Sequence, residues 1–158
     1  MSVKQLSRDN FVESVAAVLV ETGLPPSALE LEITESVLIQ AFETNVDKLE
    51  ALRAMGIRAA LDDFGTGYSS LTYLQQLPIH TLKIDQSFIN RMHHEQSTRT
   101  ITATIISLAQ QLGISVVAEG VETAEQRELL VSFGCNTIQG YSVSQPLTSS
   151  DFSQWLEK

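Results

Sequence analysis

Strand and helix patterns alternate along the whole chain, and this alternation restricts the possible folds more than any other feature. Short apolar or alternating segments are each followed, after a brief loop, by a segment with helical periodicity. We expect strands at 28–34, 57–61, 80–85, 114–118 and 136–139, and helices at 11–21, 44–55, 69–77, 98–112, 124–133 and 150–156. Repeated strand–helix–strand units form a parallel sheet covered by helices. The sequence therefore predicts an α/β fold.

Length and composition indicate one domain with an acidic surface. The 158 residues suffice for a sizeable core, and no Pro/Gly-rich linker divides them. A net charge of −9 argues against a nucleic-acid polymer or an anionic membrane surface as a partner. Cys135 is the only cysteine, the first residues lack a signal-peptide core, and no apolar run could span a membrane. We expect a cytoplasmic chain, or the cytoplasmic part of a larger sensor protein.

Polar side chains recur where the predicted strands end. The residues concerned are Glu32, Asp62, Asp63, Lys83, Glu119 and Gln139. The carboxyl ends of parallel strands lie at one edge of a sheet, where ligands bind. A single lysine cannot neutralise four carboxylates, whereas divalent cations such as Mg²⁺, Mn²⁺ or Ca²⁺ can. Two such ions held close together are the usual clamp for phosphodiester hydrolysis.

Each of these residues also has a structural interpretation. The Asp62–Asp63 pair could cap a helix or occupy a solvated turn, and Lys83 could be a partner in a structural salt bridge. Glu119 stands near a helix start, where acids are favoured by the helix dipole. We interpret His93–His94 as part of a solvated connector and not as a metal site. The recurrence of polar residues at successive strand ends favours a functional site.

Five segments carry a resemblance to a known family. They are LEITES (31–36), LDDFGTGYSSL (61–71), LKID (82–85), VVAEGVET (116–123) and QGYSVSQPL (139–147). Together, in this order, they resemble the EAL-domain family of cyclic-di-GMP phosphodiesterases. The resemblance implies a (β/α)₈ TIM-type barrel that hydrolyses cyclic-di-GMP to linear pGpG with Mg²⁺ or Mn²⁺.

The resemblance also implies a role for each matching residue. Glu32, Asp62, Asp63 and Glu119 match metal ligands, and Glu119 and Lys83 match the residues that act on the attacking water or the phosphate. Glu35 resembles a glutamate that pins the loop after the paired aspartates. Glu122, Gln139 and Pro146 resemble positions that order the pocket or touch the substrate. In the family, the loop after the paired aspartates and the helix that follows it are implicated in dimerisation.

The metal-binding Glu-Ala-Leu motif that gives the family its name would precede the matching segments and is missing there, since the string Glu50-Ala51-Leu52 lies within the helix predicted at 44–55. A second family ligand, an asparagine, would fall just before Ser2–Leu6. A full barrel needs about 250 residues, so we expect residues 1–158 to be the C-terminal two-thirds of the domain, with about five of eight strands. Hydrolysis by this chain should then be weak or absent. The alternative is a non-catalytic module that binds cyclic-di-GMP or a protein partner.

An incomplete barrel also has consequences for assembly. We expect it to expose an apolar interior and two strand edges, which a partner must cover. The sequence thus predicts a homodimer or a larger species.

Overall fold

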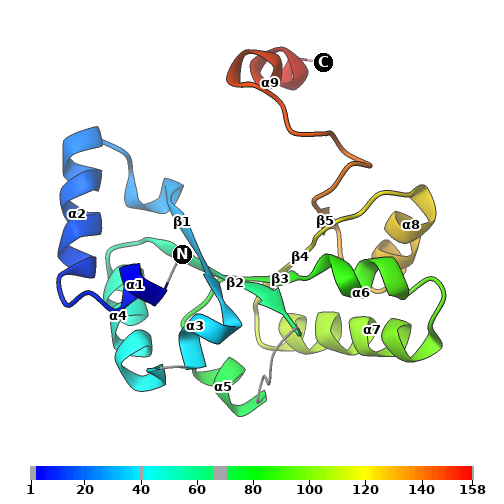
Figure 1. Cartoon of the computed structure of the whole chain (residues 1–158), viewed down its shortest axis with the longest axis horizontal. Helices are drawn as coiled ribbons and strands as arrows, with labels where there is room; N and C mark the ends of the chain where they lie inside the picture. Colours follow the sequence, from blue (N-terminus) through cyan, green and yellow to red (C-terminus); the bar gives the residue numbers. More distant parts are fainter. Residues whose placement is uncertain (1–2, 40, 66–70, 158) are drawn as a thin grey trace.

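The centre of the molecule is a five-stranded parallel sheet. The computed structural model describes residues 3–39, 41–65 and 71–157. Its strands are β1 (Glu30–Thr34), β2 (Arg58–Phe64), β3 (Thr81–Ile84), β4 (Ser115–Ala118) and β5 (Thr137–Ile138). The strands follow one another in the sheet as they do in the chain, and all pairs are parallel (Figure 1). The predicted α/β class with an incomplete barrel is confirmed.

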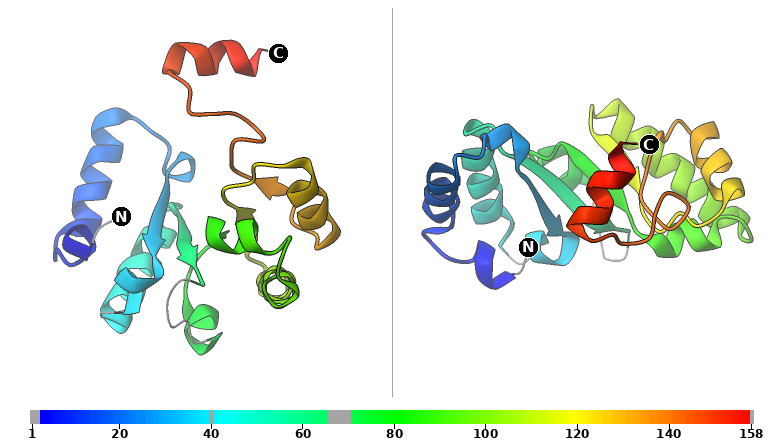
Figure 2. Two further views of the ribbon diagram at one scale, coloured as in Figure 1. Left: turned by 45° about the vertical axis from the view of Figure 1, so that its right-hand side comes forward. Right: turned by 90° about the horizontal axis from the view of Figure 1, so that it is seen from above.

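Helices surround one side of this sheet and leave the other side open. Those between or before the strands are α2 (Phe11–Thr22), α4 (Phe42–Ala54), α5 (Leu71–Gln76), α7 (Gln96–Gln111) and α8 (Ala124–Ser132). They form the outer part of an open arc in Figure 1 and in the left view of Figure 2. We refer to the helix-covered side as the convex face and to the open side as the concave face. Among the described helices, none is long and apolar enough to cross a membrane.

Three short helices and one helical turn occur where none was expected. They are α1 (Val3–Leu6), α3 (Glu35–Ile39), α6 (Gln86–Arg91) and the 3₁₀ turn Pro26–Ala28. Each is too short to show helical periodicity in a sequence. The 3₁₀ turn also delays the first strand, which begins at Glu30 and not at Ala28.

The convex face holds the core. Ile33, Leu82 and Ile84 are fully buried there, and Ile33, Leu61, Leu82 and Val116 lie in register across four strands. Helices α4 and α7 supply Leu49, Leu52 and Ile106 to the same cluster. Burying one such side chain stabilises the fold by about 1.5–3 kcal/mol. This layer therefore accounts for most of the stability that the sheet gains from its helices.

Along β1 to β3 the concave face is largely polar, so the expectation of an apolar interior is wrong there. Val117 of β4, in register with Lys83, instead lines an apolar pocket together with residues of the segment 138–155. Glu30 accepts a hydrogen bond from Thr81 (3.1 Å) and pairs with the Arg58 Nε at 3.2 Å. Glu32 and Lys83 occupy the next positions on the same face. Side chains alternate along a strand, and in these strands the inward positions carry the charged residues.

Exposed apolar side chains gather instead on the C-terminal arm, residues 139–157. The arm leads away from β5 to helix α9 (Ser149–Leu156), which stands apart from the other helices above the open side (Figure 1). Its exposed apolar residues are Tyr141, Val143, Leu147, Phe152, Trp155 and Leu156. Thr148 caps α9 by accepting a hydrogen bond from the Asp151 N–H (3.3 Å).

Candidate functional site

A bulge in β2 brings two adjacent aspartates to the same edge of the sheet. The pairing of β2 with β3 shifts between Leu61 and Phe64, so that Asp62 and Asp63 together face one residue of β3. Asp63 has φ 55°, and it is the one non-glycine residue with positive φ in the described parts of the chain. Adjacent strand residues normally point to opposite faces, and a bulge re-aims one of them. The strand thus continues through both aspartates, three residues beyond the predicted end at 61.

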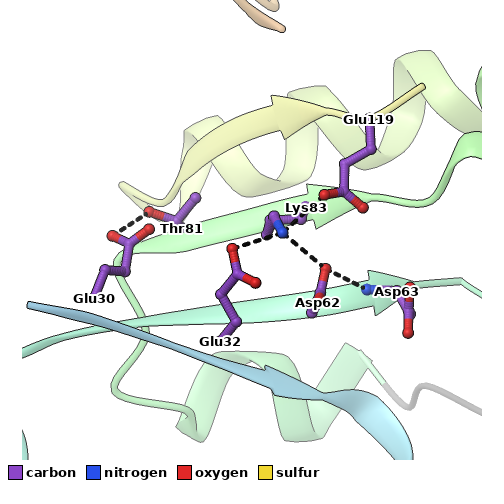
Figure 3. Close-up of polar contacts among 7 residues, drawn as sticks. All are labelled: Glu30, Glu32, Asp62, Asp63, Thr81, Lys83 and Glu119. Atoms are coloured by element: carbon purple, nitrogen blue, oxygen red, sulfur yellow. Dashed lines mark hydrogen bonds and ion pairs between the residues drawn. The ribbon is translucent and has the colours of Figure 1, made fainter. Parts of the chain in front are cut away.

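Lys83 lies at the centre of the site, on β3. Its Nζ is 2.7 Å from Glu32 Oε1, 2.8 Å from Glu119 Oε1 and 3.2 Å from Asp62 Oδ1 (Figure 3). The three carboxylates come from β1, β2 and the residue after β4, so the lysine joins three strands to its own. Its side chain is only 8% exposed. A buried ammonium needs such partners, because a charge without them is costly to remove from water.

The crowding of charges changes the acid–base properties of the site. Burial raises the pKa of Glu119, and the Lys83 ammonium only partly offsets this. Burial and the neighbouring carboxylates of Asp62 and Asp85 raise the pKa of Asp63. Burial alone would lower the pKa of Lys83, but its contacts with Glu119, Glu32 and Asp62 outweigh that effect and raise it. The lysine is therefore charged, while two of the acids are less acidic than in water.

The arrangement of the acidic groups fits a divalent cation. Asp62, Asp63 and Glu119 each offer an oxygen atom, and these oxygens all lie within 4.8 Å of one another. Mg²⁺ and Mn²⁺ prefer carboxylate oxygen ligands of this kind. Glu32 contacts the same Lys83 ammonium as Asp62 and Glu119 do, so its carboxylate lies next to theirs.

A cavity of about 430 Å³ opens beside these carboxylates. Its lining includes Asp63, Asp85, Glu119, Glu122, Gln139 and Tyr141. Two glycines allow its walls to approach closely. A Cβ on Gly120 would lie 2.5 Å from the Gln86 Cβ, and one on Gly140 would lie 2.3 Å from the Val121 carbonyl oxygen. The volume is within the range of small-molecule sites.

A capping box fixes the backbone beside Glu122. The Thr123 hydroxyl accepts a hydrogen bond from the Gln126 N–H, and Gln126 Oε1 accepts from the N–H groups of Thr123 and Glu122. This reciprocal arrangement satisfies the free donors at the start of α8. Glu122 is therefore held at the rim of the cavity by the start of a stable helix.

The remaining predicted residues lie in different surroundings. Glu35, the first residue of α3, is 5% exposed, and neither of its carboxylate oxygens has a hydrogen-bond partner among the residues that the structure describes. Pro146 is exposed on the C-terminal arm, outside the residues that line the carboxylate cavity. The segment 66–70, part of the loop that follows the paired aspartates, lies outside the described residues.

Asp85 and Tyr141 also line the cavity, although neither was among the predicted site residues. Asp85 faces it while its carboxylate accepts a hydrogen bond from the Ser87 N–H (2.9 Å), which caps α6. The LKID segment and its place at a strand end could have indicated this residue. Tyr141 lines the same cavity from the C-terminal arm, and it follows directly on Gln139–Gly140.

The chain matches an established family over most of its length. Residues 1–146 match the EAL domain. The bifunctional diguanylate cyclase/cyclic di-GMP phosphodiesterase MucR of Pseudomonas aeruginosa is 43% identical over 147 residues, which cover 93% of this chain and 22% of MucR. Cyclic di-GMP phosphodiesterase RocR of the same organism is 41% identical over 94% of this chain and 38% of RocR. The chain thus spans well under half the length of either relative.

Solved structures show the same relationship. The PaMucR phosphodiesterase in complex with c-di-GMP superposes with a TM-score of 0.92 at 41% identity, covering 96% of this chain and 62% of that one. BlrP1 of Klebsiella pneumoniae, in a manganese/c-di-GMP complex, superposes with a TM-score of 0.83 at 34% identity, covering 90% of this chain and 36% of that one. From its sequence match and from its fold, the chain belongs to the EAL domain family.

Proposed function

We propose that residues 1–158 form the C-terminal two-thirds of an EAL domain that hydrolyses cyclic-di-GMP to pGpG. One observation carries this proposal: Glu32, Asp62 and Glu119 surround the Lys83 ammonium at a single strand edge, within 3.2 Å of it. The relatives RocR and MucR are named as cyclic di-GMP phosphodiesterases. Their similarity to this chain supports the same substrate.

We assign Glu32, Asp62, Asp63 and Glu119 to the binding of Mg²⁺ or Mn²⁺. The oxygen donors of three of them converge within 4.8 Å, which supports a hard divalent cation. BlrP1 has been solved with manganese and with calcium, each together with the dinucleotide. A pair of such ions, when bound, lowers the pKa of water and stabilises charge on the phosphate.

The residues of the chain have separate tasks in this proposal. Glu119 accepts a proton from the attacking water, a role favoured by the upward shift of its pKa through burial. Lys83 remains charged and faces a phosphate oxygen. Glu122 and Gln139 hold the dinucleotide at the rim of the cavity that they line.

Two further roles concern residues outside the cluster. We propose that Glu35 orders the loop that follows the paired aspartates. The burial of its carboxylate, with no hydrogen-bond partner in the described part of the chain, supports this. Such a group is costly unless another segment provides donors for it. We propose that Pro146 orders the pocket or touches the substrate, and its place in the QGYSVSQPL segment supports this.

The test is the production of pGpG, followed by chromatography in millimolar Mn²⁺. The 158 residues alone should be slow or inactive, because they lack the upstream glutamate and asparagine that the family uses as metal ligands. A longer polypeptide with both ligands should hydrolyse the dinucleotide. Asp62→Ala in that polypeptide should reduce turnover by at least about 100-fold, whereas the exposed control Asp47→Ala should not.

Two results would contradict parts of this proposal. Fast turnover by the 158 residues alone would show that the metal ligands are wrongly assigned. Tight binding of cyclic-di-GMP by the longer polypeptide without cleavage would favour the alternative of a non-catalytic module.

We also propose that the chain forms a homodimer or a larger assembly in the cytoplasm. In the described sheet, β1 and β5 each pair along one edge only, and the C-terminal arm exposes Phe152, Trp155 and Leu156. The lone Cys135 is buried, which suits a reducing compartment. Sedimentation equilibrium at several concentrations tests the assembly, and a single monomeric species would contradict it.

A further inference from the structure

The Lys83 ammonium contacts as many carboxylates as it has hydrogen-bond donors. An ammonium has three hydrogen-bond donors and no acceptor. Three carboxylates, those of Glu32, Asp62 and Glu119, lie at 2.7, 3.2 and 2.8 Å from the Nζ atom. The donors are thus fully used by groups that the proposed function assigns to metal binding.

We propose that Lys83 is the internal cation of the metal-free site and competes with the divalent metal for its ligands. The inference rests on the proposed function, because it takes the same carboxylates as metal ligands. It adds that the lysine lowers the affinity for metal while it stabilises the fold when metal is absent.

The buried position of the lysine explains the stabilising part. Its side chain is 8% exposed, and that of Glu119 is 18% exposed. Carboxylates brought together in such a place repel one another unless a positive charge lies between them. Lys83 supplies that charge from β3, the central strand of the sheet (Figure 3). It reaches Glu32 and Asp62 on one side and Glu119 on the other.

Charge also explains the competition. Lys83 uses Oδ1 of Asp62 and Oε1 of Glu119. A divalent cation must either take these oxygens from the lysine or use the second oxygen of each carboxylate, close to the ammonium. In both cases the positive charge of the lysine opposes metal binding. An ammonium that gives up Glu32 or Glu119 can then face a phosphate oxygen.

The test compares Lys83→Met with Lys83→Arg in the 158-residue chain. Lys83→Met keeps much of the volume and removes the charge, whereas Lys83→Arg keeps the charge. Titration calorimetry with Mn²⁺ should give a dissociation constant about 10-fold lower for Lys83→Met than for the natural chain, with little change for Lys83→Arg. Without metal, Lys83→Met should melt at a lower temperature, and Mn²⁺ should raise that temperature more than it does in the natural chain.

Each other outcome has a defined meaning. Equal or weaker Mn²⁺ binding by Lys83→Met would overturn the inference and leave the proposed function intact. Absence of Mn²⁺ binding in every form would overturn the inference, while production of pGpG by the longer polypeptide would test the proposed function separately. If Lys83→Met does not fold without metal, Mn²⁺ should restore folding, and failure to do so would overturn the inference. Tighter binding by Lys83→Met, with no pGpG from the longer polypeptide, would reject the proposed function alone.

Discussion

The two faces of the sheet are built from alternating residues of the same strands, yet they have opposite properties. On the convex face, Leu82 and Ile84 are fully buried beneath helices. On the concave face, their neighbour Lys83 contacts three carboxylates. Because side chains alternate along a strand, neighbouring residues of one strand can serve different purposes. One residue stabilises the fold by packing against helices, and the next belongs to the charged cluster. Changes on the first face should alter unfolding, and changes on the second should mainly alter charge.

The largest effect on stability is expected from the convex face. Leu82→Ala removes a fully buried side chain and leaves a cavity, so the free energy of unfolding should fall by about 2–5 kcal/mol. Urea denaturation measures it. Leu147→Ala, on the exposed arm, is the matched control and should change it by less than about 0.5 kcal/mol. Equal losses for the two variants would mean that the convex face is not the main source of stability.

The bulge on β2 offers a test in which backbone and charge can be separated. Asp63 has φ 55°, a conformation that asparagine tolerates and alanine does not. Asp63→Asn should therefore be more stable than Asp63→Ala by about 1 kcal/mol in thermal or urea unfolding. Both variants should bind Mn²⁺ more weakly than the natural chain. If the two variants had the same stability, the positive φ at this position would carry no cost.

A smaller effect is expected at the far end of the concave face. Arg58 is half-exposed and pairs with Glu30 at 3.2 Å. Arg58→Ala should lower the free energy of unfolding by only about 0.2–1 kcal/mol, because water screens such a pair. Urea unfolding in low and high salt measures it, and the difference between the two chains should shrink in high salt. A loss as large as that of Leu82→Ala would show that the two faces contribute alike.

The smallest effect concerns pH. Burial and neighbouring charges raise the pKa of Asp63 and Glu119 in the folded chain. The folded state then holds protons more tightly than the unfolded state, so these groups favour folding at low pH. That contribution is lost as the pH rises through their folded pKa values. Urea midpoints in a chelator should therefore fall more in the natural chain than in a variant carrying Asp63→Asn and Glu119→Gln as the pH rises from about 4, near the ordinary pKa of these carboxyl groups, to about 7.

The sequence predicted the fold well because its main signal is local. Alternation of strand and helix patterns indicated the parallel sheet, and the carboxyl ends of strands located Glu32, Lys83 and Glu119 together. The bulge could not be predicted, because two adjacent aspartates before a glycine are equally typical of a turn. The character of the concave face was also missed, since it depends on which residues of neighbouring strands come into register, such as Glu30 with Arg58.

The order of the strands has a consequence for how the chain can fold. Each strand pairs with the next one in sequence, so every pairing closes a single crossover and none waits for a distant segment. A chain that emerges from the ribosome with its N-terminus first can add one unit at a time. Glu32 and Asp62 then meet before Lys83 arrives on β3, and Glu119 comes last. The Lys83 ammonium thus joins the growing sheet after Asp62 and before Glu119. Its positive charge can then limit the repulsion between these carboxylates during synthesis.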